Sequence, residues 1–283
     1  MSTAKNLFQV IEVPEISRGD FDFIAKSIFS LAGIHLPFNE KNVALVQNRL
    51  TKLMRKHHLN DFHELTTFLD QNLKNNTVKN DFISCLTTNK TDFFREAVHF
   101  DILLKEVKKA LAEKAEAFIW SSACSIGAEP YTMAIHLKEN LTPVEFDRVK
   151  ILATDIDVSC LNSATEGFFN SQQVEGLPPH ILNKYFSELA GLYSIDDSLK
   201  QKVHFSQLNL FNYPYSISRK FDVIFCRNVL IYFTPEDRNT ICHNLSHYLK
   251  AEGSLILGLS ETGSITVPQL KLTSNSTYQK VQL

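Results

Sequence analysis

The first third of the chain has a helical pattern of apolar residues. From about residue 16 to residue 86 they recur at spacings of three and four, as on the buried face of an amphipathic helix. Polar breaks at 37–39 and 59–61 separate the helices, and Asp61 is placed to cap the third one. The clearest runs are Phe21-Ile24-Ile28-Leu31, Val43-Val46-Leu50-Leu53 and Phe62-Leu65-Phe68-Leu69. This part of the sequence predicts a small all-helical domain.

The pattern changes at Ala117, where short apolar runs begin to alternate with helical stretches. Such alternation predicts an α/β fold with a doubly wound, mostly parallel sheet. The tail from 270 to 283, rich in Thr, Val and Leu, is expected to add an antiparallel edge pair. Strands are predicted at 118–120, 150–154, 203–205, 223–226 and 254–257, and helices at 130–139, 158–166 and 235–249.

A stretch from about 171 to 207 interrupts this alternation. It predicts a short helix over 179–189, followed by the run 190–197, so we expect a small inserted subdomain with hairpin character. The domain prediction is therefore a helical domain over 1–88 and an α/β domain over 89–283 that carries the insertion.

Composition narrows the class of protein. Of 283 residues, 44% are hydrophobic and 21% charged, as in a chain with a sizeable core. A formal net charge of -2 disfavours a nucleic-acid binder. The five cysteines are odd in number and form no C-x-x-C pair, which argues against a disulfide framework or zinc ribbon. With no signal-peptide pattern and no apolar run near ~20 residues, we expect a cytoplasmic protein without membrane insertion.

Candidate chemistry follows the predicted strands. The segment from Trp120 to Tyr131 reads as a strand, a loop of small residues and a helix start, although a simple connector would look similar. Its one glycine does not make the G-x-G-x-x-G fingerprint of dinucleotide sites. At the end of the second strand, Asp155 can accept hydrogen bonds from ribose hydroxyls, whereas Asp157 suits an N-cap.

Two further polar segments stand out. Arg227-Asn228 follows a buried strand, where an arginine is costly unless it is paired or faces a cleft. Pairing with a carboxylate and capping of a turn are the alternatives, but the position at a strand's carboxyl end favours a site role. Between 87 and 96, polar residues crowd the domain junction beside two phenylalanines; a helix cap explains Thr88 or Asn89, but not Arg95.

Taken together, these segments resemble the CheR family of chemotaxis methyltransferases. The resemblance covers nearly the whole chain, and five ordered matches are specific where each alone is weak. It implies transfer of a methyl group from S-adenosylmethionine to chemoreceptor glutamates, leaving methyl esters and S-adenosylhomocysteine. The matches are T-T-N-x-T-x-F-F-R-E (87–96), W-S-x-x-x-S-x-G-x-E-P-Y (120–131), A-T-D-I-D (153–157), F-C-R-N-V-x-I-Y-F (225–233) and G-x-S-E (258–261).

The resemblance also implies roles for single residues. Asp155 would hold the ribose, and Arg95 and Tyr232 resemble the residues that orient the incoming carboxylate beside the methyl group. A glutamate with a pKa of ~4.3 is already ionised at neutral pH, so neither a general base nor a metal is required. The implied cofactor contacts are Asn89, Thr91, Arg95, Glu129, Asp155, Asn209, Leu210, Arg227 and Asn228.

The sequence departs from the family pattern in two places. Ala128 stands where the family has the first of two glutamates, while Glu129 keeps the second. Family members that tether to a receptor's C-terminal pentapeptide have a glycine-rich, basic loop in the insertion. Here Gly191 is the loop's one glycine, flanked by acidic residues at 188, 196 and 197, which would not attract an acidic peptide. We therefore expect no pentapeptide tethering.

A basic face is predicted on the helix over 42–57. Its apolar residues gather on one side of a helical wheel and its basic residues lie roughly opposite. A solvated helix face would look the same, but the resemblance at Arg49 and Arg55 favours docking of acidic chemoreceptor helices. The docking residues are then Arg49, Lys52, Arg55 and Lys56.

Other functions are kept as alternatives. One is a related methyltransferase that modifies a different acidic protein in a non-chemotactic pathway. Another is a non-catalytic signalling module, which the retained Arg95, Glu129, Asp155, Asn228 and Tyr232 argue against. A NAD-dependent dehydrogenase is disfavoured because the triple-glycine turn is missing. We expect a monomer that binds no nucleic acid.

Overall fold

The computed structural model describes residues 14–263 and 265–281. Within these ranges the chain divides into two compact units. The first, the helical unit, holds residues up to 31 together with 35–87, and the second, the sheet unit, holds 32–34 together with 88 onwards.

The helical unit contains the three predicted helices and a fourth. They are α1 (Arg18–Ala32), α2 (Glu40–Lys56), α3 (Phe62–Asn72) and α4 (Asn76–Leu86). Asp61 caps α3 as predicted, because its side chain accepts the backbone N–H of Glu64. In α2 the apolar side of the predicted wheel is the buried side, with Val46, Leu50, Leu53 and Met54 in the core.

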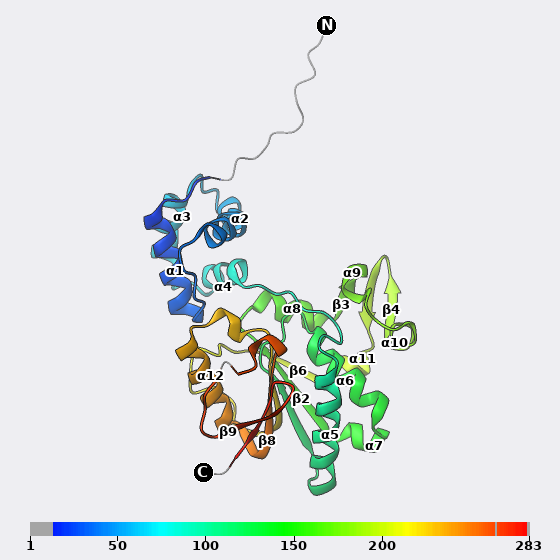
Figure 1. Cartoon of the computed structure of the whole chain (residues 1–283). Coiled ribbons are helices and arrows are strands. Elements are labelled where there is room, and N and C mark those ends of the chain that lie inside the picture. The colour runs from blue at the N-terminus through cyan, green and yellow to red at the C-terminus, as the bar shows by residue number, and fades with distance from the viewer. Residues whose placement is uncertain (1–13, 264, 282–283) are drawn as a thin grey trace. The chain divides into compact units, whose positions relative to one another are not determined.

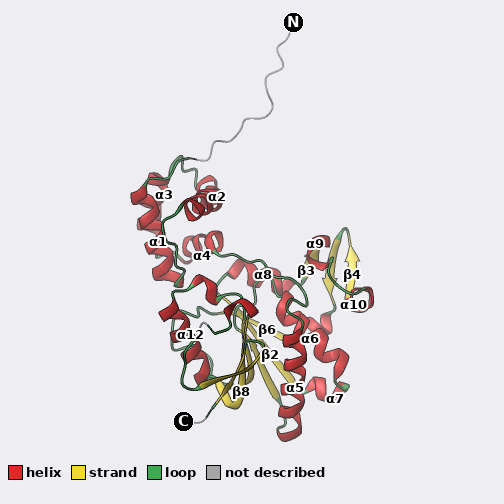
Figure 2. Cartoon of the chain, viewed as in Figure 1, coloured by secondary structure: helices red, strands yellow, loops and turns green. Residues whose placement is uncertain are grey.

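The sheet unit is built on seven strands in the order β6-β2-β1-β7-β8-β10-β9. Figures 1 and 2 show this sheet with helices beside it. The first five are parallel, and β10 and β9 add the predicted antiparallel edge pair. The α/β fold prediction is confirmed. The strands are β1 (Ala117–Ser121), β2 (Val149–Asp155), β6 (Val203–Gln207), β7 (Phe221–Cys226), β8 (Leu249–Leu257), β9 (Leu270–Ser274) and β10 (Thr277–Lys280).

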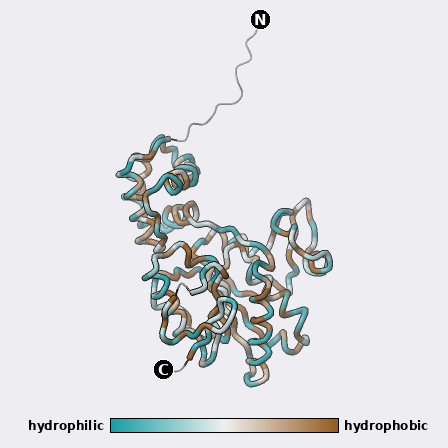
Figure 3. Tube along the Cα trace, viewed as in Figure 1, coloured by the Kyte–Doolittle hydropathy of each residue, from teal (hydrophilic) through white to brown (hydrophobic). Residues whose placement is uncertain are grey.

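Helices cover both faces of this sheet, with α12 on one side and α5 and α6 on the other (Figure 1). Strand residues alternate between two cores: Ile119 and Phe225 pack on the α5 and α6 side, Trp120 and Ile224 on the α12 side. In Figure 3 the helices alternate between hydrophilic and hydrophobic residues, as expected of helices packed on one face. The helices are α5 (Val98–Glu113), α6 (Ala128–Asn140), α7 (Pro143–Asp147), α8 (Val158–Glu166) and α12 (Pro235–His247), with short 3-10 turns η1 (Leu230–Tyr232) and η2 (Leu259–Glu261).

Helix α5 was not among the predicted elements. Its buried residues Phe100, Leu103, Val107 and Leu111 have the helical spacing, but its N-cap residue is Ala97, which has no side-chain acceptor to cap the helix. It therefore lacks the start signal that marks α3 and α8 in the sequence.

The insertion forms a second, three-stranded antiparallel sheet in the order β3-β5-β4. The expected hairpin is β4–β5, which turns at Ala190-Gly191 with positive φ at both residues. The predicted helix over 179–189 ends at Tyr185, because the next four residues form β4. The small sheet starts at 168, before the predicted insertion, and β6 at its predicted end belongs to the main sheet. Its elements are β3 (Phe168–Asn170), α9 (Ser171–Val174), α10 (Pro179–Tyr185), β4 (Phe186–Leu189), β5 (Leu192–Ile195) and α11 (Asp197–Lys200).

Candidate active site

Most of the predicted site residues follow the carboxyl ends of neighbouring strands. Asp155 ends β2, Glu129 opens α6 after β1, and Arg227 follows β7. These three strands are adjacent in the sheet, so their ends meet at one edge. Asn209 and Leu210 come after β6, next to Asp155, whose carbonyl accepts the backbone N–H of Leu208 at 2.9 Å.

Asp155 is buried and its carboxylate holds two backbone groups. One oxygen accepts the N–H of Ser125 at 2.7 Å, and the other accepts the N–H of Asp157 at 3.0 Å. Burial raises the pKa of Asp155, while these two donors act in the opposite direction. Each oxygen has a second lone pair, so the carboxylate can also accept a hydrogen bond from a ligand hydroxyl.

Asn89 joins the loop before α5 to the ends of β1 and β2. Its side-chain amide donates to Asp157 at 2.7 Å, and its carbonyl accepts the hydroxyl of Ser125 at 2.8 Å. Asp157 also caps α8 through the N–H groups of Ser159 and Cys160, so its predicted N-cap role is confirmed. Thr91 lies half-buried further along the same loop.

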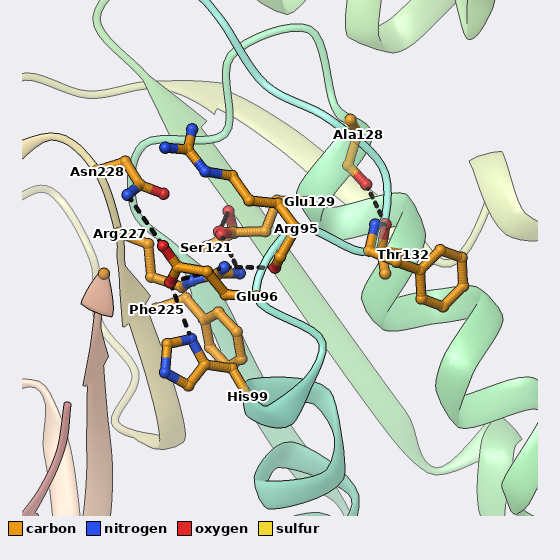
Figure 4. Close-up of polar contacts among 12 residues, drawn as sticks. Arg95, Glu96, His99, Ser121, Ala128, Glu129, Thr132, Phe225, Arg227 and Asn228 are labelled. Carbon is orange, nitrogen blue, oxygen red and sulfur yellow. Dashed lines mark hydrogen bonds and ion pairs between the residues drawn. The ribbon is translucent and has the colours of Figure 1, made fainter. Parts of the chain in front are cut away.

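Arg227 is the centre of a buried ion-pair cluster (Figure 4). Its guanidinium lies 3.1 Å from the carboxylate of Glu129 and 3.2 Å from that of Glu96. The Nη2 group also donates to the backbone carbonyl of Arg95 at 2.5 Å. Pairing with carboxylates, the alternative left open by the sequence, is therefore what the structure shows for the Arg227 side chain.

Glu129 connects this cluster to β1. Its second carboxylate oxygen accepts the hydroxyl of Ser121 at 2.7 Å. Burial raises the pKa of Glu129, against the opposing effects of Arg227 and Ser121. Ala128 beside it is buried in the core, so the position where the family has another glutamate holds a small apolar side chain.

Asn228 has a left-handed backbone, with φ of 58°, and a buried carboxylate holds it in place. Glu261 accepts the N–H groups of Asn228, Leu230 and Gly258, each at 2.8 Å. A Cβ at Gly258 would lie 2.8 Å from the Glu261 carboxylate and 3.1 Å from the Asn228 backbone nitrogen, which these hydrogen bonds hold together, so the close approach favours glycine.

The two catalytic candidates are close in sequence to this cluster: Arg95 precedes Glu96, and Tyr232 follows Arg227 and Asn228. The Arg95 side chain is half-buried and leads away from Glu96 and Arg227, while its carbonyl faces Arg227 (Figure 4). Tyr232 is half-buried in η1, shortly after Asn228.

Sequence reasoning missed several residues that organise the site. Ser121, Ser125, Glu96 and Glu261 were all inside matched motifs, but no role was assigned to them. His99, just after the first motif, was also missed; its ring is buried 3.4 Å from Glu96. The available signals were an acid directly after a matched arginine for Glu96, and the acid that ends the G-x-S-E motif for Glu261.

The predicted docking residues lie on α2 in the helical unit, and they are not equivalent. Lys52 and Arg55 are exposed and line one groove together with Asn48 and Thr51. Arg49 instead donates to the carbonyls of Leu86 and Thr87, both at 2.9 Å. Arg49 is half-buried and caps the end of α4 through these contacts, whereas Lys52 and Arg55 are exposed.

Lys56 is exposed as well, but it makes an ion pair of 2.5 Å with Asp81 of α4.

Among the residues that the structure describes, no helix is long and apolar enough to cross a bilayer. The same ranges contain no group of three or more His, Cys, Asp or Glu side chains arranged to hold a metal ion.

Comparison with known proteins shows the family. Residues 19–87 match the family model "CheR methyltransferase, all-alpha domain", and residues 89–279 match "CheR methyltransferase, SAM binding domain". The chain is 38% identical to the chemotaxis protein methyltransferase of Borreliella burgdorferi, over 93% of this chain and 94% of that protein. Identity to the protein of the same name is 35% in Salmonella typhimurium, over 96% and 93% of the two chains. In Escherichia coli it is 34%, over 96% and 94%. The chain therefore belongs to the CheR family of methyltransferases and contains that family's S-adenosylmethionine-binding domain.

Proposed function

We propose that this protein transfers the methyl group of S-adenosylmethionine to glutamate side chains on the cytoplasmic helices of chemoreceptors. The observation that carries this proposal is the placement of Arg95. Its charged side chain leaves a loop that is anchored to the cofactor edge of the sheet by Arg227 and Asn89. A cation on an anchored loop at this edge suits a substrate that presents a carboxylate.

The residues at the sheet edge fit the cofactor. Asp155 would accept hydrogen bonds from the ribose, and the small residues of the loop over 121–125 allow close approach of a ligand. Asn228 presents an amide from a loop that Glu261 holds rigid. The other residues that we propose for cofactor binding are Asn89, Thr91, Arg95, Glu129, Asn209, Leu210 and Arg227, the last two being buried and acting from behind the surface.

The proposed reaction does not require a general base. S-adenosylmethionine supplies an electrophilic methyl group on a positively charged sulfur. A free glutamate has a pKa of ~4.3, so the nucleophilic carboxylate is ionised before it binds. Arg95 would orient that carboxylate through its fork of N–H donors, and Tyr232 would contribute a hydrogen bond or its ring face. Orientation of this kind can lower a barrier by about 7–11 kcal/mol.

The test is methyl transfer from S-adenosyl-[methyl-³H]methionine to receptor-enriched membranes. We expect label on receptors that alkali releases as methanol, because methyl esters are base-labile, and no label with receptor-free membranes. Base-stable label would contradict a carboxyl ester. Label on a non-receptor protein would favour the related, non-chemotactic methyltransferase instead. Calorimetry with S-adenosylhomocysteine checks the cofactor site independently. Failure of the protein to bind it would contradict both the chemoreceptor methyltransferase and the non-chemotactic methyltransferase.

Docking of the receptor is a separate part of the proposal. Reversing the charge of Lys52 and Arg55 together (K52E/R55E) is expected to lower kcat/KM for receptor methylation about tenfold, through lost attraction to acidic helices. S-adenosylhomocysteine affinity should not change. K26E/K74E is the matched control, because it makes the same charge change at exposed positions of the helical unit outside α2. Equal kcat/KM values for the two variants would contradict docking on α2.

Arg49 and Lys56 are left unchanged in this experiment, because replacing them would also remove their contacts with α4 and so change the structure of the helical unit.

We further propose that the protein acts in the cytoplasm as a monomer, without a pentapeptide tether. The acidic Glu188 lies on the β4–β5 hairpin, where a basic side chain would be needed to attract an acidic peptide.

A further inference from the structure

Glu96 connects three separate segments of the sheet unit. One carboxylate oxygen lies 3.2 Å from Nη2 of Arg227 and accepts the backbone N–H of Leu259 at 3.1 Å. The other accepts the side-chain amide of Asn228 at 3.4 Å. The loop before α5, the loop after β7 and the start of η2 therefore meet at one carboxylate. Figure 4 shows its contacts with Arg227 and Asn228.

The backbone around Glu96 is held in an unfavourable conformation. Phe94 and Glu96 have φ of 55° and 54°, in the left-handed region that side-chain-bearing residues rarely adopt. Arg95 lies between them. Such residues persist where surrounding contacts over-determine them, and they cluster at functional sites.

The charge of Glu96 is maintained by its partners. Burial raises the pKa of this carboxyl group, but Arg227, the N–H of Leu259 and the amide of Asn228 outweigh it, so the net pKa is lowered. Glu96 is therefore an anion at neutral pH and attracts the guanidinium of Arg227.

That attraction reaches Arg95 through a shared donor group. The Nη2 of Arg227 that faces Glu96 also donates to the Arg95 carbonyl at 2.5 Å, and Glu129 holds the opposite side of the same guanidinium. Moving or neutralising Glu96 would let Arg227 shift toward Glu129. The Arg95 backbone would then lose the contact that sets the direction of its side chain.

His99 lies beside Glu96 but does not form an ion pair with it, so the Glu96 carboxylate pairs with Arg227. Its Nε2 faces the Asn275 carbonyl at 2.8 Å and must carry the proton, so Nδ1 turns a lone pair toward Glu96. Burial and the charge of Arg227 lower the pKa of His99, which keeps the ring neutral at physiological pH. A neutral ring does not compete with Arg227 for the carboxylate.

We propose that Glu96 is a positioning residue: through Arg227 and Asn228 it holds Arg95 in the orientation that aligns the substrate carboxylate. This rests on the proposed methyl transfer to glutamate. Glu96 need not touch substrate or cofactor, so it is distinct from the catalytic role proposed for Arg95.

The test is a double-mutant cycle between Glu96 and Arg95. Glu96→Gln keeps the side-chain size and removes the charge, and we expect kcat to fall about tenfold at saturating S-adenosylmethionine and receptor. In an Arg95→Lys background the same substitution should lower kcat less than twofold, because the orientation that it disturbs is already lost. S-adenosylhomocysteine affinity by calorimetry should change less than threefold.

Controls separate this inference from the proposed function. Base-labile methylation by the unmodified protein establishes the function before any variant is read. Glu175→Gln, an exposed position in the same unit, should keep full kcat. An unchanged kcat in Glu96→Gln, or the same fold-loss in both backgrounds, would overturn the positioning role. Glu96→Asp, which keeps the charge on a shorter arm, should lose less than Glu96→Gln, and it replaces that variant in the cycle if thermal unfolding shows a folding defect.

Discussion

Arg227→Met is expected to lower the free energy of unfolding at pH 7 by about 3–5 kcal/mol, the usual effect of removing one partner from a buried ion pair. The Arg227 side chain is 1% exposed, and its partners Glu96 and Glu129 are 15% and 11% exposed. Methionine fills a similar volume but leaves two nearly buried carboxylates without their cation. Denaturant unfolding of the whole protein measures the change.

The pH dependence of this loss gives a second check. Without Arg227, desolvation raises the pKa of both carboxyl groups, so the folded variant binds more protons than the unfolded chain. Its stability should increase as the pH falls from 8 to 5. In the unmodified protein the lowered pKa of Glu96 acts with the opposite sign, since its stabilisation is lost as the pH falls through the folded pKa.

The stability difference between the two proteins should therefore narrow at low pH. Arg219→Met is the matched control, because it removes an exposed arginine that lies over the ring of Phe118. An equal loss in both variants, or a loss in Arg227→Met that does not depend on pH, would show that Arg227 does not stabilise buried carboxylates. Adding Glu129→Gln to Arg227→Met should recover part of the loss.

Arg95→Ala is expected to lower kcat of receptor methylation by about 10²–10³-fold, comparable to the loss of a preorganised donor at a reacting oxygen. The substrate carboxylate would lose the cation that orients it toward the methyl group. Arg95→Lys should retain part of the activity, because an ammonium group keeps the charge but not the planar fork of donors. Single-turnover methylation at saturating S-adenosylmethionine measures the effect.

Calorimetry with S-adenosylhomocysteine separates the two roles proposed for Arg95. Weaker binding reports a contact with the cofactor, whereas a lower kcat at saturation reports orientation of the substrate. Lys90→Ala serves as the control, because it removes an exposed cation from the same loop. A kcat for Arg95→Ala equal to that of the Lys90→Ala control would eliminate Arg95 as the orienting residue.

Local signals predicted most of the elements. Helices α3 and α8 begin at the capping residues Asp61 and Asp157, as expected, because an N-cap is a contact within four residues. Helix α5 lacks such a cap and was missed. The predicted helix end at Leu189 was also wrong: the helix ends at Tyr185, since residues 186–189 pair with β5 instead of continuing the helix.

The site was predictable in its members but not in their partners. Asp155, Glu129 and Arg95 stand out as polar residues at predicted strand ends or loops. That Arg227 pairs with Glu129, 98 positions earlier, depends on the adjacency of β1 and β7 in the sheet. Arg49 shows the same limit: the wheel places it among basic neighbours, while the end of α4 binds it.

The sequence alone determined the class of fold, the starts of the capped helices α3 and α8 and the family, since these depend on spacing, capping and short motifs along the chain. Only the tertiary structure decided which charges are buried together and which remain exposed. The reason is physical: the energy of a charge depends on the groups that replace its water, and folding brings those groups from distant parts of the chain.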